Sequence, residues 1–495
     1  MPEHTRCIDY RLYYDTVGRR PITEAYGKIG TTQTGGRMNS ATQTLKKTKH
    51  VPPPMVSGRR PLLGHAIEFM RDPHKVIRRG YEEHGMIFSL DLGRRKAVVM
   101  LGPHYHQFFF KETDGVFSMR QGYETLLKMF DSKLFTFAHL TEAQEQMKVI
   151  LPLLKNNDRF ADLMVDEVDH FMANTLTEHG EIDVTDAFGP VVMHIGARAF
   201  FGDDFREQLG AEYFYMFREF SQGADVVMPS WLPLPKFKRC LKAKAQIEQM
   251  IYAFMLERRN KPMEPKDLFQ ELIESTYYDG KPVPEDLLVS ILLFIPWAAH
   301  ETTVGHVSWT LIDLLQNPDY LAQVKQELQL VLGDSEDYAP DKLKQLKTLD
   351  WAILESERIH PVAHVIMRGV RDDMEFDGFI VSKGSMVFVA PQTAHNIPEV
   401  FSHPEQYDPM RFSPERMEGS KKFSLIGFGG GAHRCAGVNF AKLEIKIIMA
   451  KLLQNYDIEL LDKAPKPNPG VETKWPQRPC RIRYTRRAHR SKKAG

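Results

Sequence analysis

The sequence predicts a mainly helical protein with a few short strands. Apolar residues recur at helical spacing from about residue 103 to about residue 360, and Pro, Gly and Asn interrupt this pattern repeatedly. Runs typical of strands lie mainly before residue 103 and after residue 362. The chain has 495 residues, of which 42% are apolar and 26% are charged, which is the composition of a globular protein with a large core.

Charge and cysteine content exclude several classes of protein. A formal net charge of +1 argues against a nucleic-acid partner and against an electrostatic membrane-binding surface. The four cysteines, Cys7, Cys240, Cys435 and Cys480, are too few and too scattered for a disulfide framework or a zinc site. They suit a reducing compartment, so we expect a cytoplasmic protein.

No segment is long and apolar enough to predict a transmembrane anchor. The longest nearly apolar run is Leu287–Ala299, which Ser290 and Pro296 interrupt. Its length is typical of a buried core helix. The N-terminus also lacks a signal peptide with an apolar segment.

The two ends of the chain are polar. Residues 1–50 are rich in Thr, Gly, Arg and Lys, and residues 486–495 are basic. We expect both segments to be disordered, the second as a solvated tail. Ordered structure is expected to begin at the proline-rich, extended stretch Val51–Gly64.

The first regular elements are a helix and a hairpin. Asp72–His84 has helical apolar spacing. Met86–Leu92 and Lys96–Leu101 alternate as strands and are separated by a Gly-Arg turn, which predicts a β-hairpin. The chain becomes helical again from Pro103.

Prolines and glycines divide the rest. The stretch Trp231–Pro235 separates two long helices, predicted over residues 206–222 and 236–259. This loop either caps an apolar pocket or merely connects the helices. Later, Met374–Ile380 and Met386–Ala390 are predicted strands, with Gly378 and Gly384 at turns.

A glycine-rich stretch, Phe428–Gly437 (FGGGAHRCAG), carries one cysteine, Cys435. An apolar approach, Phe423–Phe428, precedes it, and Val438–Leu453 follows with helical spacing. Glycines let the backbone turn and let a flat ligand come close. A helix N-terminus favours a thiolate over a thiol. A thiolate beside such a turn suits ligation of haem iron.

Other interpretations of this stretch compete. A lone cysteine is most often a small buried apolar residue. Gly427, Gly429 and Ala432 also fit a dinucleotide-binding pattern with Asp462 as its acidic residue. Too few residues follow Asp462 to complete a doubly wound sheet. A phosphate loop would require Gly-Lys-Ser/Thr, which does not follow.

A second motif lies in the predicted core helix Ile291–Trp309. Glu301 and Thr302 interrupt its apolar run, and a buried carboxylate is costly unless it is paired or solvated. Pro296 disturbs the helical hydrogen bonds, and Ala299 keeps one face thin. We interpret the pair as a carboxyl and a hydroxyl that pass protons in a cavity. The alternative is a helix whose Glu301 faces solvent.

Two further motifs contain arginines. Glu355 and Arg358 lie three residues apart in the predicted helix Trp351–His360, so they can pair on one face. Arg411, in the aromatic-flanked turn Tyr407–Phe412, can complete a Glu–Arg–Arg triad. Each motif alone carries little information.

The order of these motifs resembles that of the cytochrome P-450 superfamily of haem-thiolate monooxygenases. An acid–alcohol pair comes first, then Glu-x-x-Arg, a Pro-x-Arg-Phe turn, and Phe-x-x-Gly-x-His-x-Cys-x-Gly near the end. The resemblance implies one mostly helical domain with a small β-rich lobe, here over residues 51–485. The early hairpin and the strands after residue 370 would form the lobe.

The resemblance implies a role for each motif residue. Cys435 would be the axial ligand of the iron of haem b, and Phe428 would shield its thiolate. Glu301 and Thr302 would deliver protons during the activation of dioxygen. The Glu–Arg–Arg triad would be a buried structural element behind the haem.

Within the superfamily, the chain is most similar to the sterol 14α-demethylase branch. ESERIHPVAHVIMR matches that branch's Glu-x-x-Arg helix and its following Met-Arg pair. His433, Arg368, Tyr123 and Lys148 fall where the branch places partners of the haem propionates.

Three features depart from that branch. Glu301 stands where the branch usually has His, and Ala299 stands where it usually has Gly. Residues 123–135 keep the spacing but lack the expected Pro and Gly. These positions would line the substrate pocket.

The resemblance also implies partners. They are a lipophilic substrate, O2 and an external electron donor, either a ferredoxin or a flavodoxin with its reductase. A predicted docking surface for the donor consists of Lys421, Lys422, Arg434, Lys442 and Lys446. Two other functions remain open: a haem-thiolate isomerase or dehydratase, and a haem-based sensor.

Overall fold

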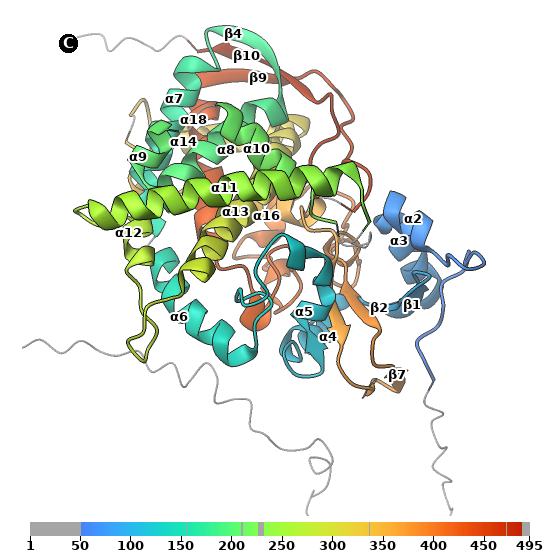
Figure 1. Ribbon diagram of the computed structural model, residues 1–495. Helices are drawn as coiled ribbons and strands as arrows, with labels where there is room; N and C mark the ends of the chain where they lie inside the picture. The colour runs from blue at the N-terminus through green and yellow to red at the C-terminus, as the bar shows by residue number, and fades with distance from the viewer. Residues whose placement is uncertain are drawn as a thin grey trace, which may run out of the picture. The chain divides into compact units, whose positions relative to one another are not determined.

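A computed structural model describes residues 51–155, 157–208, 211–225, 232–335, 337–471 and 473–487 (Figure 1). All of them fall within one compact unit, His50–Gly495. The predicted disorder of residues 1–50 and of most of the basic tail lies outside the described residues. The prediction of a mainly helical chain with a small β-rich part is confirmed.

The helices follow one another along the chain with few strands between them. The α-helices are α2 (Ala66–Arg71), α3 (Pro73–His84), α4 (Gly102–Lys111), α5 (Met119–Gly122), α6 (Leu140–Lys155), α7 (Ala161–Asn174), α8 (Val184–Phe201), α9 (Asp203–Gln208), α10 (Ala211–Ser221), α11 (Pro235–Asn260), α12 (Leu268–Ile273), α13 (Glu285–Gln316), α14 (Pro318–Val331), α15 (Pro340–Leu343), α16 (Lys347–Ile359), α17 (Pro391–Ala394) and α18 (Val438–Asn455). Short 3-10 helices are η2 (Glu124–Lys128), η3 (Asn157–Phe160), η4 (Pro409–Phe412), η5 (Glu418–Ser420) and η6 (Gly431–His433).

The strands form three sheets. The largest has the order β1-β2-β8-β5-β3, from β1 (Ile87–Asp91), β2 (Lys96–Met100), β8 (Met386–Val389), β5 (Ile366–Val370) and β3 (Phe117–Ser118). A second has the order β4-β10-β9, from β4 (His179–Asp183), β10 (Arg481–Arg486) and β9 (Tyr456–Leu460). A third pairs β6 (Met374–Phe376) with β7 (Phe379–Val381).

Local sequence accounts for the first elements. The Asp72 side chain accepts a hydrogen bond from the Lys75 amide at 3.1 Å, and Pro73 occupies the first turn of α3. The hairpin β1–β2 has the predicted strands, paired from Ile87 with Met100 to Asp91 with Lys96. Capping and alternation therefore suffice to define these elements.

Long-range pairing defines the rest of the β-rich lobe. β2 pairs parallel with β8, and β8 pairs antiparallel with β5. β5 lies in the region after residue 362 where strands were expected, but it was not among the strands predicted individually. The predicted single strand Met374–Ile380 is two strands, since the chain turns at Asp377 and Gly378, both with positive φ.

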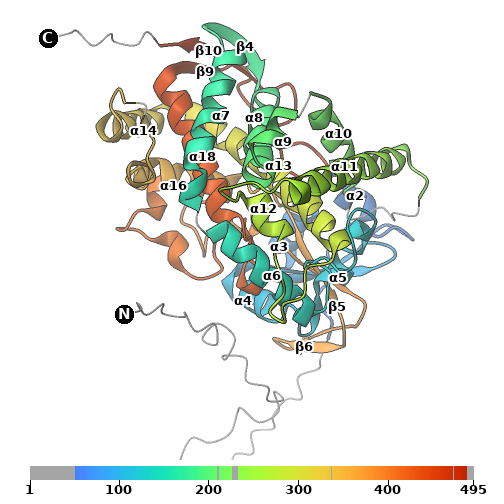
Figure 2. The same ribbon diagram turned by 60° about the vertical axis from the view of Figure 1, so that its left-hand side comes forward.

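The central helix α13 positions the candidate site. It packs against α8, α11, α16 and α18, and α11 crosses in front of it in Figure 1. The same helix lies between α8 and α12 in the rotated view of Figure 2. It continues through Pro296 as α-helix along its whole length.

Length and composition alone would allow α13 to cross a membrane, in contrast to the prediction made from its shorter apolar run. In the structure, however, 61% of its most apolar window is buried inside the protein. α13 is therefore a helix of the protein core.

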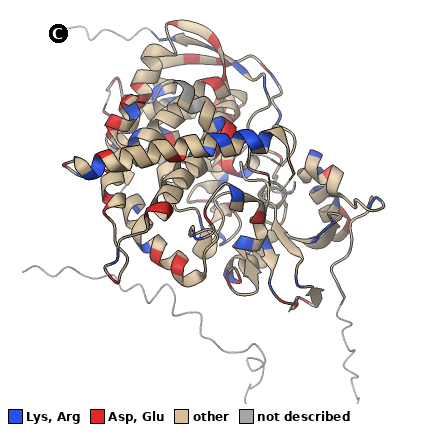
Figure 3. Ribbon diagram, viewed as in Figure 1, with Lys and Arg blue, Asp and Glu red and all other residues tan. Residues whose placement is uncertain are grey.

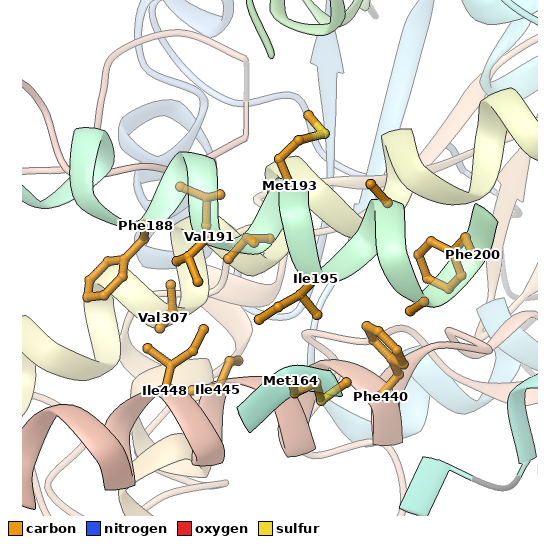
Figure 4. Close-up of a cluster of buried hydrophobic side chains, with 14 of the residues drawn as sticks. Met164, Phe188, Val191, Met193, Ile195, Phe200, Val307, Phe440, Ile445 and Ile448 are labelled. Carbon is orange, nitrogen blue, oxygen red and sulfur yellow. The ribbon is translucent and has the colours of Figure 1, made fainter. Parts of the chain in front are cut away.

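Much of the core lies between α8 and α18. Figure 4 shows Ile195 of α8 pointing toward Phe440, Ile445 and Ile448 of α18, and all four residues are buried. Hydrophobic burial of this kind is the main favourable contribution to folding. It fixes α18, and with it the loop that carries Cys435.

The helices on either side of the predicted loop differ in detail from the prediction. The predicted helix over residues 206–222 is divided between α9 and α10, and α11 begins at Pro235. Trp231 lies outside the described residues, so the proposed capping of an apolar pocket stays a prediction.

Candidate haem site

The glycine-rich loop brings Cys435 to the start of α18. The Cys435 amide donates to the Phe428 carbonyl at 2.9 Å, and the Gly429 amide donates to the Ile426 carbonyl at 2.8 Å. Gly429 adopts a φ of +71°, a region that favours glycine. The loop therefore reverses the chain and leaves the cysteine at its end.

Two glycines of this loop allow a close contact with Phe110 of α4. A Cβ at Gly431, which has a φ of +65°, would lie 2.7 Å from the Phe110 carbonyl oxygen. A Cβ at Gly430 would lie 2.9 Å from the rings of Phe110 and Phe423. These glycines allow the loop to approach α4, whereas the sequence suggested only the approach of a flat ligand.

Cys435 is exposed as a residue, although protein atoms surround its sulfur. Desolvation by the surrounding protein raises its pKa, although the Gly437 amide and Arg434 act in the opposite direction. Burial therefore opposes the effect of the helix N-terminus, and the expected thiolate stays a prediction. A bound metal cation would supply the missing positive charge, because a coordinating thiol loses its proton.

The middle of α13 is open on one side. Residues 303–314 are buried, whereas Ala298, Ala299, Glu301 and Thr302 are only partly buried. The helix is therefore covered along most of its length and leaves these side chains partly accessible in its middle. The sequence motif coincides with this accessible stretch.

Hydrogen bonds fix this part of α13. The Thr302 hydroxyl donates to the Ala298 carbonyl at 2.7 Å, and the Trp475 indole N–H donates to the Glu301 carbonyl at 2.7 Å. The Glu301 side chain is 20% exposed, and its Oε1 lies 3.9 Å from His300 Nδ1. It is therefore not the fully solvated carboxylate of the alternative interpretation.

A buried cation lies at the edge of the β-rich lobe. The Arg368 guanidinium is 2% exposed, donating to Thr113 Oγ1 at 3.2 Å and to the Met367 carbonyl at 2.7 Å. Tyr123 accepts from the Met367 amide at 3.3 Å and also contacts Arg368. In the described part of the chain, no carboxylate lies within ion-pair distance of Arg368.

His433 lies near the same lobe, in η6. Its Nε2 is 2.5 Å from Asp114 Oδ2. Desolvation opposes the ionisation of Asp114, but the hydrogen bond from His433, with the charges of Arg371 and Arg368, lowers the pKa of Asp114. Arg368, Tyr123 and His433 therefore belong to one polar region.

Two other predicted residues have different surroundings. Lys148 is 63% exposed on α6, pairs with Glu145 at 2.5 Å and lies over the Tyr278 ring. No described contact joins it to Arg368 or His433. Phe428, in contrast, is joined to Cys435 by a backbone hydrogen bond, and its ring centroid lies 5.9 Å from that of His306.

The Glu–Arg–Arg triad is confirmed. Glu355, Arg358 and Arg411 are all 0% exposed. Arg358 donates to both carboxylate oxygens of Glu355 at 2.8 Å, and Arg411 Nε donates to Glu355 at 3.2 Å. The arginines also donate to carbonyls of the loop that leads to η4, such as Pro404 and Gln406. The triad therefore fastens this loop to α16.

The predicted docking surface is only partly free. Lys446 is buried and pairs with Asp350 at 2.6 Å, and Lys442 pairs with Glu357 at 3.3 Å. Exposed cations that remain beside the cysteine loop are Lys421, Lys422 and Arg434.

The sequence profile of the family described as Cytochrome P450 matches residues 52–482. The chain belongs to this family. It is therefore a cytochrome P450 monooxygenase, and its family implies haem, O2, a lipophilic substrate and a redox partner.

Sterol demethylases of several kingdoms are similar to this P450. A sterol 14alpha-demethylase of Mycolicibacterium vanbaalenii is 29% identical over 444 residues, which cover 88% of this chain and 98% of the relative. The sterol 14-demethylase of Arabidopsis thaliana is 28% identical, with 88% of this chain and 91% of the relative covered. Human lanosterol 14-alpha demethylase is 26% identical, with 88% and 87% covered.

A solved structure supports the fold. The cyanobacterial CYP120A1 bound to retinoic acid superposes with a TM-score of 0.81 at 22% identity, covering 89% of this chain and all of that one. This similarity shows the P450 fold and nothing about substrate.

The residues present fit haem. Cys435 offers a thiol that a metal cation would deprotonate and bind. The buried Arg368 would be compensated by a bound anion, because a buried charge without a counter-ion is costly. Haem iron and a haem propionate carry these two charges. The open middle of α13 provides a wall of small side chains, Ala298 and Ala299, for a flat group.

Sequence reasoning missed Thr113, Asp114 and Trp475. Asp114 and Gly115 form an Asp-Gly turn, which is a recognisable signal, but the contact of Asp114 with His433 spans 319 positions. Trp475 carries no local signal, because only folding brings the C-terminal segment beside Glu301.

Proposed function

We propose that this P450 oxidises a sterol or another polycyclic isoprenoid. The observation that carries the proposal is the similarity to sterol 14-demethylases over almost their whole length, in bacteria, plants and human. The sequence ESERIHPVAHVIMR and His433 support the same branch. Glu301 and Ala299 differ from it, so the pocket is expected to accept a substrate of related but not identical shape.

The proposed site assigns a task to each residue. Cys435 Sγ ligates the iron of haem b, with Phe428 shielding the sulfur from water. Arg368, Tyr123 and His433 hold the propionates by charge-assisted hydrogen bonds. When bound, haem supplies the activation of dioxygen, which no protein side chain can perform.

Glu301 and Thr302 are proposed to move protons. The Thr302 hydroxyl donates to the Ala298 carbonyl, so its lone pairs can accept a hydrogen bond from water and hold that water in place. Glu301 is partly exposed and can exchange protons with that water. Neutral small side chains beside them leave the space in which water can stand.

The electron donor is proposed to be a ferredoxin or a flavodoxin with its reductase. Its acidic surface would meet Lys421, Lys422 and Arg434. Cys240, Cys435 and Cys480 are unpaired thiols, which supports work in a reducing compartment such as the cytoplasm.

Two spectra test the proposal. The ferrous carbonyl complex is expected to show the red-shifted Soret band of thiolate ligation, and Cys435→His is expected to abolish it. A wild-type band typical of histidine ligation would overturn the assignment of the ligand.

Substrate class is tested on the same protein. Titration with lanosterol-like sterols, other terpenoids, fatty acids and polyketides is expected to give a spectral shift at low concentration with sterols or their relatives. NADH consumption with reconstituted redox partners is expected to yield an oxidised product. A response to another lipophile and to no sterol would remove the sterol assignment and leave the haem chemistry intact.

A further inference from the structure

Two segments from far along the chain meet at the accessible middle of α13. A Cβ at Gly305 would lie 2.8 Å from the Val362 side chain and 3.1 Å from the Trp475 ring, so Gly305 lets both side chains approach the helix. The Lys474 amide donates to the Val362 carbonyl at 3.0 Å and joins the two segments. Gly305 lies about one helical turn after Glu301, so both segments adjoin the proposed proton-moving residues.

The first of these segments offers apolar side chains. Residues 362–366 (VAHVI) are all partly buried, and four of the five are apolar. Ala298 and Ala299 of α13 are partly buried as well. Small apolar side chains of this kind suit the body of an isoprenoid, which is mostly hydrocarbon.

A cation lies beside the second segment. The guanidinium carbon of Arg218, a partly buried residue of α10, is 5.1 Å from the centroid of the Trp475 ring. Trp475 is 8% exposed, and its indole N–H donates to the Glu301 carbonyl. One aromatic side chain therefore separates the guanidinium from the backbone of the proposed proton-moving residue.

The charge of Arg218 also acts on the interior of α13. Desolvation is the main reason that the pKa of His300 falls to about 4, and the positive charge of Arg218 acts in the same direction. His300 is 2% exposed and directly precedes Glu301 in the helix. A ring contact and an electrostatic effect thus place Arg218 at the same stretch of α13.

Arg218 has no counter-ion in the described part of the chain. Among the described arginines that are not exposed, only Arg218 and Arg368 lack a carboxylate within ion-pair distance. Arg368 is the proposed partner of a haem propionate. Stacking on a ring leaves the N–H groups at the edge of a guanidinium able to donate, and two of them match the two oxygens of a carboxylate.

We propose that Arg218 binds a carboxylate group of the substrate, which is therefore an acid of the sterol or isoprenoid class. Two N–H groups of the guanidinium donate to the carboxylate, and Trp475 holds the guanidinium in place. The apolar body of the substrate lies against Ala298, Ala299 and Val362. The inference rests on the proposed function, because it specifies which isoprenoids the same site accepts.

Matched pairs of ligands test the inference on the haem-loaded, full-length protein. Lithocholic acid and abietic acid are polycyclic isoprenoid acids, and their methyl esters keep the shape without the charge. Spectral titration and equilibrium dialysis give the Kd of each ligand. Wild type is expected to bind each acid at least about tenfold more tightly than its ester, because a hydrogen bond between charged groups is stronger than one between neutral groups.

The decisive variant is Arg218→Gln, which keeps a polar side chain and removes the charge. It is expected to weaken the binding of both acids at least about tenfold and to leave the Kd of the esters unchanged. Arg218→Lys keeps the charge without the planar fork and should retain part of the preference for acids. Arg239→Gln is the matched control and should bind every ligand like wild type, because Arg239 is 52% exposed on α11 and pairs with Glu219.

Two results would overturn the inference. One is equal binding of acids and esters by wild type. The other is a loss of affinity in Arg218→Gln that is the same for acids and esters, which would show that Arg218 only shapes the pocket.

Failure of the proposed function is recognised separately with lanosterol, palmitate and methyl palmitate. Binding of palmitate that depends on Arg218, with no binding of lanosterol or of any polycyclic acid or ester, would remove the isoprenoid and keep the anion site. Binding of lanosterol, with acid affinities that Arg218→Gln does not change, would keep the isoprenoid and remove the anion site.

Discussion

At the scale of single residues, the stability of the protein is most sensitive to mutation in the buried triad of Glu355, Arg358 and Arg411. Glu355 is the only carboxylate that Arg358 contacts in the described chain, and it also accepts from Arg411 and from the Asp408 amide at 2.8 Å. Removing one partner of a buried ion pair leaves a charge without compensation. The loss of stability should exceed the loss caused by breaking an ion pair on the surface.

Glu355→Ala is therefore expected to lower the free energy of unfolding by about 3–5 kcal/mol and to give protein with little haem. Glu82→Ala is the control, because Glu82 and its partner Arg78 are 59% and 66% exposed. The control is expected to cost less than about 1 kcal/mol. Denaturant unfolding and haem content measure both, and equal effects in the two variants would contradict the buried triad.

Thr302→Ala tests the proposed proton delivery at the residue scale. The Thr302 hydroxyl bonds to the Ala298 carbonyl of its own helix, and such a bond adds little to helix stability. Folding and substrate binding of the variant are therefore expected to change little. The yield of product per NADH is expected to fall and the yield of hydrogen peroxide to rise, because proton delivery during the reduction of dioxygen is no longer controlled by the Thr302 hydroxyl. Unchanged coupling in both Thr302→Ala and Glu301→Gln would mean that protons arrive by another route.

At the scale of elements, the cysteine loop depends on its packing against α4. Gly430 faces the rings of Phe110 and Phe423, whereas Gly431 faces the Phe110 backbone and has a positive φ. A ring can be replaced by a smaller side chain, but a carbonyl cannot be moved without moving α4. The two glycines should therefore respond differently to the same second mutation.

Gly430→Ala is expected to destabilise the protein by about 1–3 kcal/mol through overpacking, and Phe110→Leu should restore part of this loss. Gly431→Ala is expected to lower stability and haem content without any rescue by Phe110→Leu. Unfolding midpoints of the four variants measure the difference. Equal rescue of both glycine variants would show that the backbone contact is unimportant.

Ion pairs of Glu418 with Arg411 and Arg416 hold the segment from η4 to η5 and depend on pH. Burial opposes ionisation of Glu418, but hydrogen bonds from Arg416 and Ser402 and the charge of Arg411 lower its pKa to about 2. Because the pKa of Glu418 is lower in the folded than in the unfolded state, its ionised form stabilises the folded protein fully above about pH 4.5. This stabilisation is lost as the pH falls towards about 2.

Glu418→Gln is expected to cost on the order of 2 kcal/mol at pH 6, and the difference from wild type should shrink below about pH 4.5. Urea unfolding at a series of pH values measures it. A difference that does not depend on pH would show that Glu418 acts by shape and not by charge.

At the scale of the whole molecule, positive and negative residues are interspersed along the described chain, as Figure 3 shows, in keeping with a net charge of +1. A small basic surface can nevertheless direct a partner locally. Lys421, Lys422 and Arg434 are exposed next to or within the loop that leads to Cys435, which is the proposed docking surface for the electron donor. Lys442 and Lys446 pair with carboxylates of α16 and add little to this surface.

Reversal of charge at Lys421, Lys422 and Arg434 is expected to slow reduction by a ferredoxin or flavodoxin several-fold at low ionic strength. The loss should diminish as salt screens the surface. Lys383→Glu, at a side chain that is 68% exposed in the β-rich lobe, is the control and should have little effect. Stopped-flow reduction rates measure both, and similar rates for the two variants would place the docking surface elsewhere.

Much of this protein could be predicted because its signals are local. The i,i+3 spacing of Glu355 and Arg358, the capping of α3 and the alternation of β1 and β2 are properties of neighbouring residues. The order of the motifs also identified the family, and with it Cys435. Such features need no knowledge of distant contacts.

The remaining features depend on contacts between residues far apart in the chain. The pairing of β5 with β8, the link of Asp114 to His433 over 319 positions and the approach of Phe110 to Gly431 arise only on folding. Burial is likewise a tertiary property: it raises the pKa of Cys435, against the effect of the helix N-terminus, and raises the pKa of Glu444 well above its usual value. Sequence alone determined which chemical groups the site contains, because side-chain identity and short-range spacing are encoded directly. Tertiary structure decided their charge states and partners, because both depend on how much water the packed chain excludes.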